Sequence, residues 1–160
     1  MIKGCCKSNK YHKAFELFSC MKQSPASQPN LITYNCILDV CVKNDDLEKA
    51  AILFQEIYEK HQPDLISYST MIKGHCRTKN VKKAFSLLTD MISVKIIPDE
   101  PIFNLILDAC ANGTFYQIGL ETYNLMLGLE VFTSAMTFGI MIKVFFCPIT
   151  KNRSMVTPRE

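Results

Sequence analysis

A ten-residue segment of this chain occurs twice, and its spacing limits the folds that the chain can adopt. Residues 1–10 read MIKGCCKSNK, and residues 71–80 read MIKGHCRTKN. The two copies are separated by twice 35 residues. A sequence that resembles itself at a period of about 20 to 50 residues is typical of repeat proteins, in which each repeat stacks on its neighbours. We therefore expect an array of short repeats.

The register of this segment divides the 160 residues into repeats of 34 or 35 residues. We expect the following organisation: a partial repeat at 1–30, whole repeats at 31–64 and 65–99, a degenerate repeat at 100–134, the first helix of a further repeat at 135–147, and an irregular tail at 148–160. Because residue 1 falls inside a repeat, we expect the chain to be a fragment or a short member of its kind.

Each repeat has the apolar spacing of two helices separated by a short turn. In the repeat 31–64, apolar residues recur at i, i+3, i+4 and i+7 in both halves. The first stripe contains Ile32, Tyr34, Ile37, Leu38 and Cys41, and the second contains Leu47, Ala50, Leu53, Phe54 and Ile57. One helical hairpin cannot bury both apolar faces by itself. The predicted fold class is all-α, an α-solenoid of stacked helix-turn-helix hairpins.

The segments between the helices carry residues that cap helix N-termini. Residues 44–46, Asn80 and residues 112–114 precede the second helices of the three repeats. Asp64 and Asp99 precede the first helices of the repeats that follow them. Asn, Asp and Thr side chains accept hydrogen bonds from the unpaired N–H groups of a first helical turn. These positions are therefore predicted helix starts.

One position in the second helix of each repeat holds a small residue. Ala14, Ala50 and Ala84 occupy it, and Gly119 takes their place in the degenerate repeat. A methyl group or a hydrogen atom allows two helix backbones to approach closely. We expect close helix packing at this position.

The cysteines and histidines give no support to a metal site or an enzyme. None of the eight cysteines forms a CxxC pair, and the three histidines show no HxxxH or HxE spacing. Cys5, Cys41 and Cys110 share one repeat position with His75, which indicates packing. His75 and Cys76 are adjacent in a helix, so their side chains point about 100° apart. We expect no enzyme, no cofactor and no bound metal.

The global charge is uninformative, whereas hydropathy argues against a membrane protein. With a net charge of +3, any nucleic-acid binding would have to come from local basic positions. The apolar runs are shorter than the roughly 20 residues that cross a bilayer. We expect no membrane partner, and a reducing compartment suits the unpaired cysteines.

The repeats resemble pentatricopeptide repeats of the plain, uniform-length P type. The resemblance is carried by TYNCILDVCVKNDDLEKAAILFQEI, by SYSTMIKGHCRTKNVKKAFSLLTDM and by the endings QPD and IPD. The Trp-Leu-Gly-Tyr pattern of tetratricopeptide repeats is absent, since the chain has no Trp. The resemblance covers residues 1–146. It implies a right-handed superhelix that binds single-stranded RNA, one base per repeat.

In this family, the fifth and the last residue of a repeat contact the edge of a base. The corresponding base-reading pairs here are Asn35 with Asp64, Ser69 with Asp99, and Asn104 with Ser134. By resemblance, the three pairs prefer uracil, guanine and a pyrimidine, with a leaning to cytosine. The implied core is 5′-U-G-Y-3′.

The resemblance also implies apolar contacts to the bases and basic contacts to the phosphates. The second residue of each repeat clamps a base between its neighbours, and the residues at this position are Ile32, Ile66, Pro101 and Met136. A basic thirteenth residue contacts the phosphate backbone, and the residues at this position are Lys7, Lys43 and Arg77. Asn112 interrupts this basic series in the degenerate repeat.

The resemblance implies a role in organelle RNA metabolism. Members of this family act by occupancy in RNA processing, stability, splicing or translation. They do so in mitochondria or plastids, and they can bind other RNA-processing proteins. No transit peptide is visible in the first residues. The expected principal partner is single-stranded RNA.

Two alternatives stay open on the sequence. Asp64, Asp99 and the basic residues can be no more than helix caps and a solvated face. The solenoid can also be a protein-interaction scaffold. The segment 115–132 is apolar on nearly all sides, which favours a partner protein or self-association.

Overall fold

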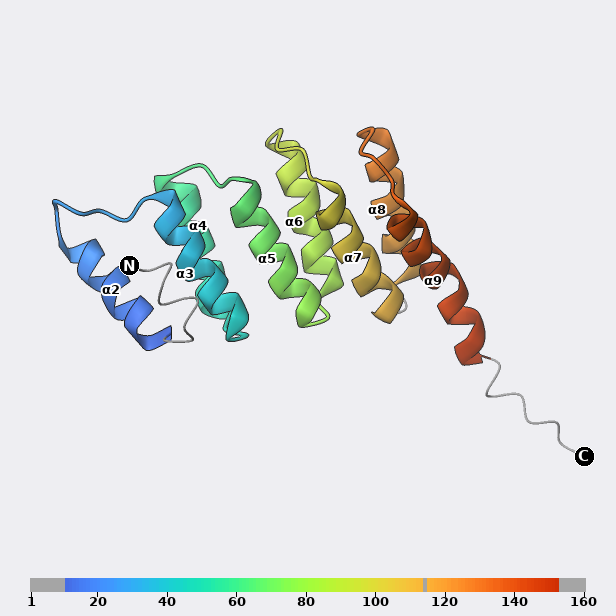
Figure 1. The fold of residues 1–160 in the computed structure, drawn as a ribbon, viewed down its shortest axis with the longest axis horizontal. Coiled ribbons are helices and arrows are strands. Elements are labelled where there is room, and N and C mark those ends of the chain that lie inside the picture. Colours follow the sequence, from blue (N-terminus) through green and yellow to red (C-terminus); the bar gives the residue numbers. More distant parts are fainter. Residues whose placement is uncertain (1–10, 114, 153–160) are drawn as a thin grey trace, which may run out of the picture. The chain divides into compact units, whose positions relative to one another are not determined.

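The structure is a computed structural model that describes residues 11–113 and 115–152. Its regular structure in these residues is helical, as predicted. The helices are α2 (Tyr11–Gln23), α3 (Leu31–Lys43), α4 (Leu47–Lys60), α5 (Leu65–Arg77), α6 (Val81–Ser93), α7 (Glu100–Gly113), α8 (Tyr116–Gly128) and α9 (Ala135–Asn152) (Figure 1). Within the described part of the chain, none of them has the length and hydropathy of a membrane span.

The chain divides into two compact units, residues 1–74 and residues 75–160. In the first unit, α3 packs against both α2 and α4. In the second unit, α7 packs against α6, α8 and α9. The pairs α3–α4 and α7–α8 therefore form two of the hairpins that the apolar spacing predicted.

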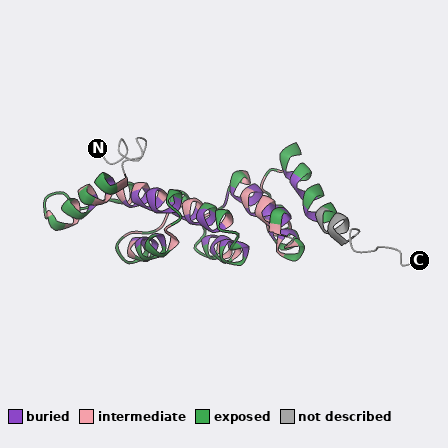
Figure 2. Ribbon diagram, turned by 90° about the horizontal axis from the view of Figure 1, so that it is seen from below, coloured by how far each residue is buried: buried purple, intermediate pink, exposed green. Residues whose placement is uncertain are grey.

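The core of the first unit follows the predicted stripe of α3, with one exception. Tyr34, Ile37, Leu38 and Cys41 are almost completely buried, whereas Ile32 is 62% exposed. Ile32 and Tyr34 are two residues apart, so they lie about 200° apart around the helix. Ile32 therefore belongs to the apolar stripe of the sequence but not to the buried face of α3. Figure 2 shows the alternation of buried and exposed residues along the helices.

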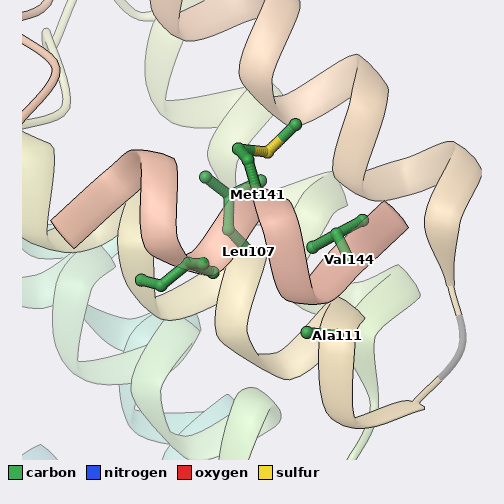
Figure 3. Close-up of a cluster of buried hydrophobic side chains, with 5 residues drawn as sticks. Leu107, Ala111, Met141 and Val144 are labelled. Atoms are coloured by element: carbon green, nitrogen blue, oxygen red, sulfur yellow. The ribbon is translucent and has the colours of Figure 1, made fainter. Parts of the chain in front are cut away.

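In the second unit, α7 and α9 share an apolar cluster. It consists of Leu107, Ala111, Ile140, Met141 and Val144 (Figure 3). Gly119 of α8 lies beside it, and a Cβ atom there would come within 2.9 Å of Val144 Cγ1. The expected close approach at this repeat position is therefore observed. Its counterparts Ala14, Ala50 and Ala84 are fully buried.

Most of the predicted caps are present. The pairs of predicted capping side chain and backbone N–H are Asp46 with Lys49, Asp64 with Ser67, Asn80 with Lys83, and Asp99 with Ile102. Asn30, which was not predicted as a cap, also accepts from the N–H of Thr33. The cap expected from Asn112 is wrong. Asn112 still belongs to α7 and donates to Asp108, and α8 begins after Phe115 without a side-chain cap.

Among the residues that the structure describes, four turns contain a non-glycine residue in the left-handed region. Asp45, Lys79, Lys95 and Glu130 have φ angles of 57°, 59°, 63° and 55°. After each of them, the next N–H donates to a carbonyl five residues earlier, as Ile96 N does to Met91 O at 3.1 Å. This arrangement satisfies carbonyl groups at a helix C-terminus, where glycine is the usual residue.

Helix α9 is longer than the sequence predicted. It continues to Asn152, whereas an irregular tail was expected from residue 148. Pro148 removes one N–H donor, and a helix interior can tolerate this loss at a cost in stability. The remainder of the expected tail, residues 153–160, lies outside the described residues.

Replacement of Lys95 by glycine should stabilise the chain. An L-residue in the left-handed conformation costs about 1–2 kcal/mol, more than the added freedom of glycine in the unfolded chain. We expect Lys95→Gly to raise the free energy of unfolding by about 0.5–1 kcal/mol, measured in urea. The matched control Lys82→Gly lies inside α6 and should lower it by about 1 kcal/mol. Losses of similar size in both variants would contradict this assignment.

Stability should depend on the ionisation of Asp64. Burial alone would raise the pKa of Asp64, but hydrogen bonds from Ser67 and Asn35 outweigh it and hold the pKa below its ordinary 3.8. The stabilisation is therefore present above pH 3.8 and is lost as the pH falls through the lower folded-state pKa. Asp64→Ala should lower the free energy of unfolding by about 1 kcal/mol at neutral pH. In acid unfolding curves, the two proteins should converge; a constant difference down to about pH 2 would contradict the claim.

Candidate functional site

The first predicted base-reading pair, Asn35 and Asp64, forms a direct hydrogen bond. Asn35 Nδ2 donates to Asp64 Oδ1 at 3.0 Å, and the Asn35 side chain is buried. Ser67 completes the arrangement, because its hydroxyl lies 2.7 Å from Asn35 Oδ1 and 2.9 Å from Asp64 Oδ1. The amide of Asn35 is thus held between α3 and the start of α5.

Asp64 makes two kinds of contact, one to the backbone and one to a side chain. Its Oδ1 atom accepts the backbone N–H of Ser67 at 2.9 Å, which caps α5. The same oxygen accepts the side-chain amide of Asn35. The carboxylate of Asp64 therefore caps the first helix of the next repeat and also orients the Asn35 amide of its own repeat. Capping does not argue against a reading role here.

The second predicted pair lies across the two compact units. Ser69 belongs to the first, and its hydroxyl donates to the Ile66 carbonyl at 3.1 Å. Asp99 belongs to the second and caps α7 through the N–H of Ile102 at 3.2 Å. The pairing of Ser69 with Asp99 stays a prediction.

The third predicted pair is organised by a residue that the sequence did not single out. Glu100 Oε1 accepts from Asn104 Nδ2 at 3.2 Å and from the backbone N–H of Ser134 at 3.1 Å. It also accepts the hydroxyl of Thr137 at 2.9 Å. Ser134 Oγ accepts from the N–H of Met136 at 3.2 Å, at the start of α9. Glu100 therefore connects Asn104 with the segment that leads into α9.

A pocket of about 640 Å³ lies between α7 and α9. It contains four of the residues predicted from the sequence, namely Pro101, Asn104, Ser134 and Met136. Glu100, Asp108 and Lys143 are charged residues of the same lining. The fold thus brings a predicted reading pair and the two predicted clamping residues around one pocket.

The predicted clamping residues are apolar side chains on the surface. Ile32, Ile66 and Met136 are 62%, 58% and 68% exposed, and Pro101 is exposed as well. Apolar side chains at the second position of four repeats, all left in solvent, are available for contact with the flat faces of bases.

The predicted phosphate-contacting cations differ in their surroundings. Lys43 Nζ forms an ion pair with Asp39 Oδ2 at 2.6 Å, one turn earlier on α3. In α7 the corresponding positions are occupied by Asp108 and Asn112, and Asn112 Nδ2 donates to Asp108 Oδ2 at 3.1 Å. Arg77 is exposed at the end of α5. Lys7 lies outside the described residues.

The third residue of a repeat was not singled out from the sequence. Thr33, Ser67 and Thr137 are hydroxyl residues at this position, and Ile102 replaces them in the degenerate repeat. The hydroxyls of Thr33 and Thr137 donate to Asn30 and Glu100, and that of Ser67 lies between Asn35 and Asp64. The recurrence of Ser or Thr was a signal that could have identified them. Glu100 gave no such signal, because Leu31, Leu65 and Ala135 hold its repeat position elsewhere.

The described residues do not form a metal centre, and the adjacent His75 and Cys76 are poorly suited to catalysis. No group of three His, Cys, Asp or Glu side chains in the described residues could hold a metal ion. Burial, and then the charge of Lys83, lowers the pKa of His75. Burial raises the pKa of the Cys76 thiol to about 12, so it stays protonated at neutral pH.

Two curated plant proteins are similar to this chain in sequence. "Pentatricopeptide repeat-containing protein At3g04130, mitochondrial" of Arabidopsis thaliana is 31% identical over 110 residues, which are 68% of this chain and 22% of that protein. A second Arabidopsis relative, At5g18475, is 32% identical over 55% of this chain and 18% of its own length. The chain therefore spans about a fifth of the length of these relatives.

Two solved structures share the fold. The pentatricopeptide repeat protein PPR10 from maize matches with a TM-score of 0.83 at 23% identity, over 96% of this chain and 22% of that chain. The pentatricopeptide repeat domain of Arabidopsis thaliana protein-only RNase P 1, in complex with tRNA, matches with a TM-score of 0.79 at 16% identity, over 99% and 89% of the two chains. The fold class is thus the predicted α-solenoid of helical hairpins.

Two family models match this chain. The model described as PPR repeat family matches residues 29–77 and 63–112. The model described as pentatricopeptide repeat domain matches residues 1–44. More than half of the chain is covered by these matches, and the chain belongs to the pentatricopeptide repeat family.

Proposed function

We propose that this chain binds single-stranded RNA with sequence preference, at a core of 5′-U-G-Y-3′. The observation that carries the proposal is the oriented amide of Asn35, held by Asp64 and Ser67. It lies three residues from the exposed apolar side chain of Ile32 on the same helix. A fixed polar group beside an apolar contact suits a base, which has a polar edge and an apolar face.

The hydrogen-bonding capacity of Asn35 fits uracil. One Nδ2 hydrogen is taken by Asp64, and one lone pair of Oδ1 is taken by Ser67. One donor hydrogen and one acceptor lone pair remain on the amide. Uracil presents an N3–H donor beside carbonyl acceptors, so it can pair with both remaining groups.

Family membership supports RNA as the ligand and an organelle as the location. One structure of the same fold is a complex with tRNA, and one relative carries a mitochondrial designation. We propose a mitochondrial or plastid RNA-binding protein that acts by occupancy and not by catalysis. Other RNA-processing proteins are proposed as further partners.

The exposed apolar side chains around α8 favour protein contact as a second candidate function. Tyr116, Leu120 and Leu127 of this helix are 58%, 42% and 50% exposed, and Phe132 beyond it is 75% exposed. Such a surface suits a scaffold or self-association. The polar groups at the reading positions make RNA the first candidate.

Binding should depend on both base sequence and salt. We expect fluorescence anisotropy to show tighter binding of short single-stranded RNAs with a UGC or UGU core than of scrambled cores. Two or three phosphate contacts should give a slope of log K against log salt of about −1.4 to −2.1. Equal binding of every core would contradict the sequence preference. No binding at low salt would remove RNA as the ligand and leave the scaffold function.

Replacement of Ser69 by asparagine should change the preference at the second base. An amide at this position can pair with uracil in the way proposed for Asn35, so the preference should move from guanine towards uracil by about tenfold. The measurement compares UGU and UUU cores in the same anisotropy assay. The matched control Ser86→Asn, on the exposed side of α6, should change neither affinity. If Ser69→Asn leaves the ratio unchanged, Asp99 is a helix cap only.

A further inference from the structure

The degenerate repeat 100–134 lacks the last-residue carboxylate that Asp64 provides in the repeat 31–64. In the repeat 31–64, Asp64 Oδ1 accepts from the amide of Asn35 and from the backbone N–H of Ser67, and the hydroxyl oxygen of Ser67 lies 2.9 Å away. The corresponding last residue of the repeat 100–134 is Ser134, which has no carboxylate.

Glu100 is surrounded by the same three kinds of polar group. Its Oε1 atom receives the amide of Asn104, the backbone N–H of Ser134 and the hydroxyl of Thr137. Asn104 occupies the repeat position of Asn35, and Thr137 occupies that of Ser67. Hydrogen bonds from Ser134 and then Thr137 hold the pKa of Glu100 below its ordinary value, so the carboxylate is ionised at neutral pH.

The two asparagine side chains differ at their carbonyl oxygens. Asn35 Oδ1 accepts the hydroxyl of Ser67. Asn104 Oδ1 is buried without a hydrogen-bond partner, and Asn104 lines the pocket between α7 and α9. A buried acceptor without a partner is unfavourable, because it has lost its water and gained nothing in return. A donor from a ligand in the pocket would satisfy it.

We propose that Glu100 takes the place of the missing last-residue carboxylate and positions Asn104 to read uracil in preference to cytosine. This inference rests on the proposed RNA-binding function. It sharpens the third base of the core from a pyrimidine that leans to cytosine to uracil, and it shifts the polar partner of Asn104 from Ser134 to Glu100.

The preference follows from the effect of the carboxylate on the amide. An amide whose N–H donates to an anion is a stronger acceptor at its oxygen and a weaker donor at its second N–H. Uracil offers the N3–H of an imide, a strong donor, and needs only weak donation to its carbonyl. Cytosine offers a weaker amine donor and needs a good donor for its N3 atom. The amide of Asn104 therefore matches uracil better.

The test compares RNAs that differ only at the third base, UGU and UGC. The parent chain should bind UGU about tenfold more tightly than UGC. Glu100→Gln keeps the size of the side chain but removes the charge, and should reduce this ratio to about twofold or less. The ratios at the first two bases should not change, since those positions do not involve Glu100.

Two further variants separate positioning from general stability. Ser134→Asp in the Glu100→Gln background supplies a carboxylate at the last position, and should restore the preference for uracil. The matched control Glu121→Gln makes the same charge change on the exposed side of α8 and should leave the ratio at its parental value. A preserved helical circular dichroism spectrum shows that a variant is folded.

The outcomes distinguish this inference from the proposed function. A chain that binds no RNA overturns both. A chain that prefers a U-G core but binds UGC as tightly as UGU, or more tightly, overturns the role of Glu100 alone, and this result needs no variant. A uracil preference that survives Glu100→Gln also overturns that role. Loss in Glu100→Gln with recovery in the double variant supports it.

Discussion

A helical hairpin of this length has more apolar surface than it can bury by itself, and the fold follows from this constraint. Each hairpin must pack one apolar face against the neighbouring hairpin. This packing requires small residues where the helices approach closely. Ala14, Ala50 and Ala84 meet the requirement, and Gly119 meets it beside Val144. The cluster of α7 and α9 then holds in place the two helices that line the pocket. Packing thus comes first, and the polar contacts are built on it.

Periodicity predicted most of the fold because burial repeats with the sequence. The helices, their capping residues and the small-residue positions all followed from recurrence at 34 or 35 residues. The predictions failed where one residue departs from the pattern. Ile32 lies in the apolar stripe but is exposed, and α9 was ended at Pro148 because proline usually ends a helix. Neither outcome is determined by composition alone.

The sequence predicted which residues belong to the candidate site, but it did not predict the contacts between them. Sequence alone identified Asn35 and Asp64, but their direct hydrogen bond and the part of Ser67 needed coordinates. Glu100 was not predictable, because it substitutes from a different position of the repeat for a residue that is absent. A repeat alignment records which residue stands at a position. It does not show that a carboxylate from a different repeat position, such as Glu100, can contact the fifth residue in the way that Asp64 contacts Asn35.

The left-handed residues Asp45, Lys79, Lys95 and Glu130 bear on how such a chain can evolve. Each turn holds a side chain where glycine would be more stable, so each is a position at which a single substitution adds stability. Asn104 Oδ1 is buried without a hydrogen-bond partner, which reduces stability, and a change of base preference can leave other such groups. The turns lie apart from those groups in the sequence. The chain therefore has sites at which the stability lost in acquiring a new preference can be recovered without altering that preference.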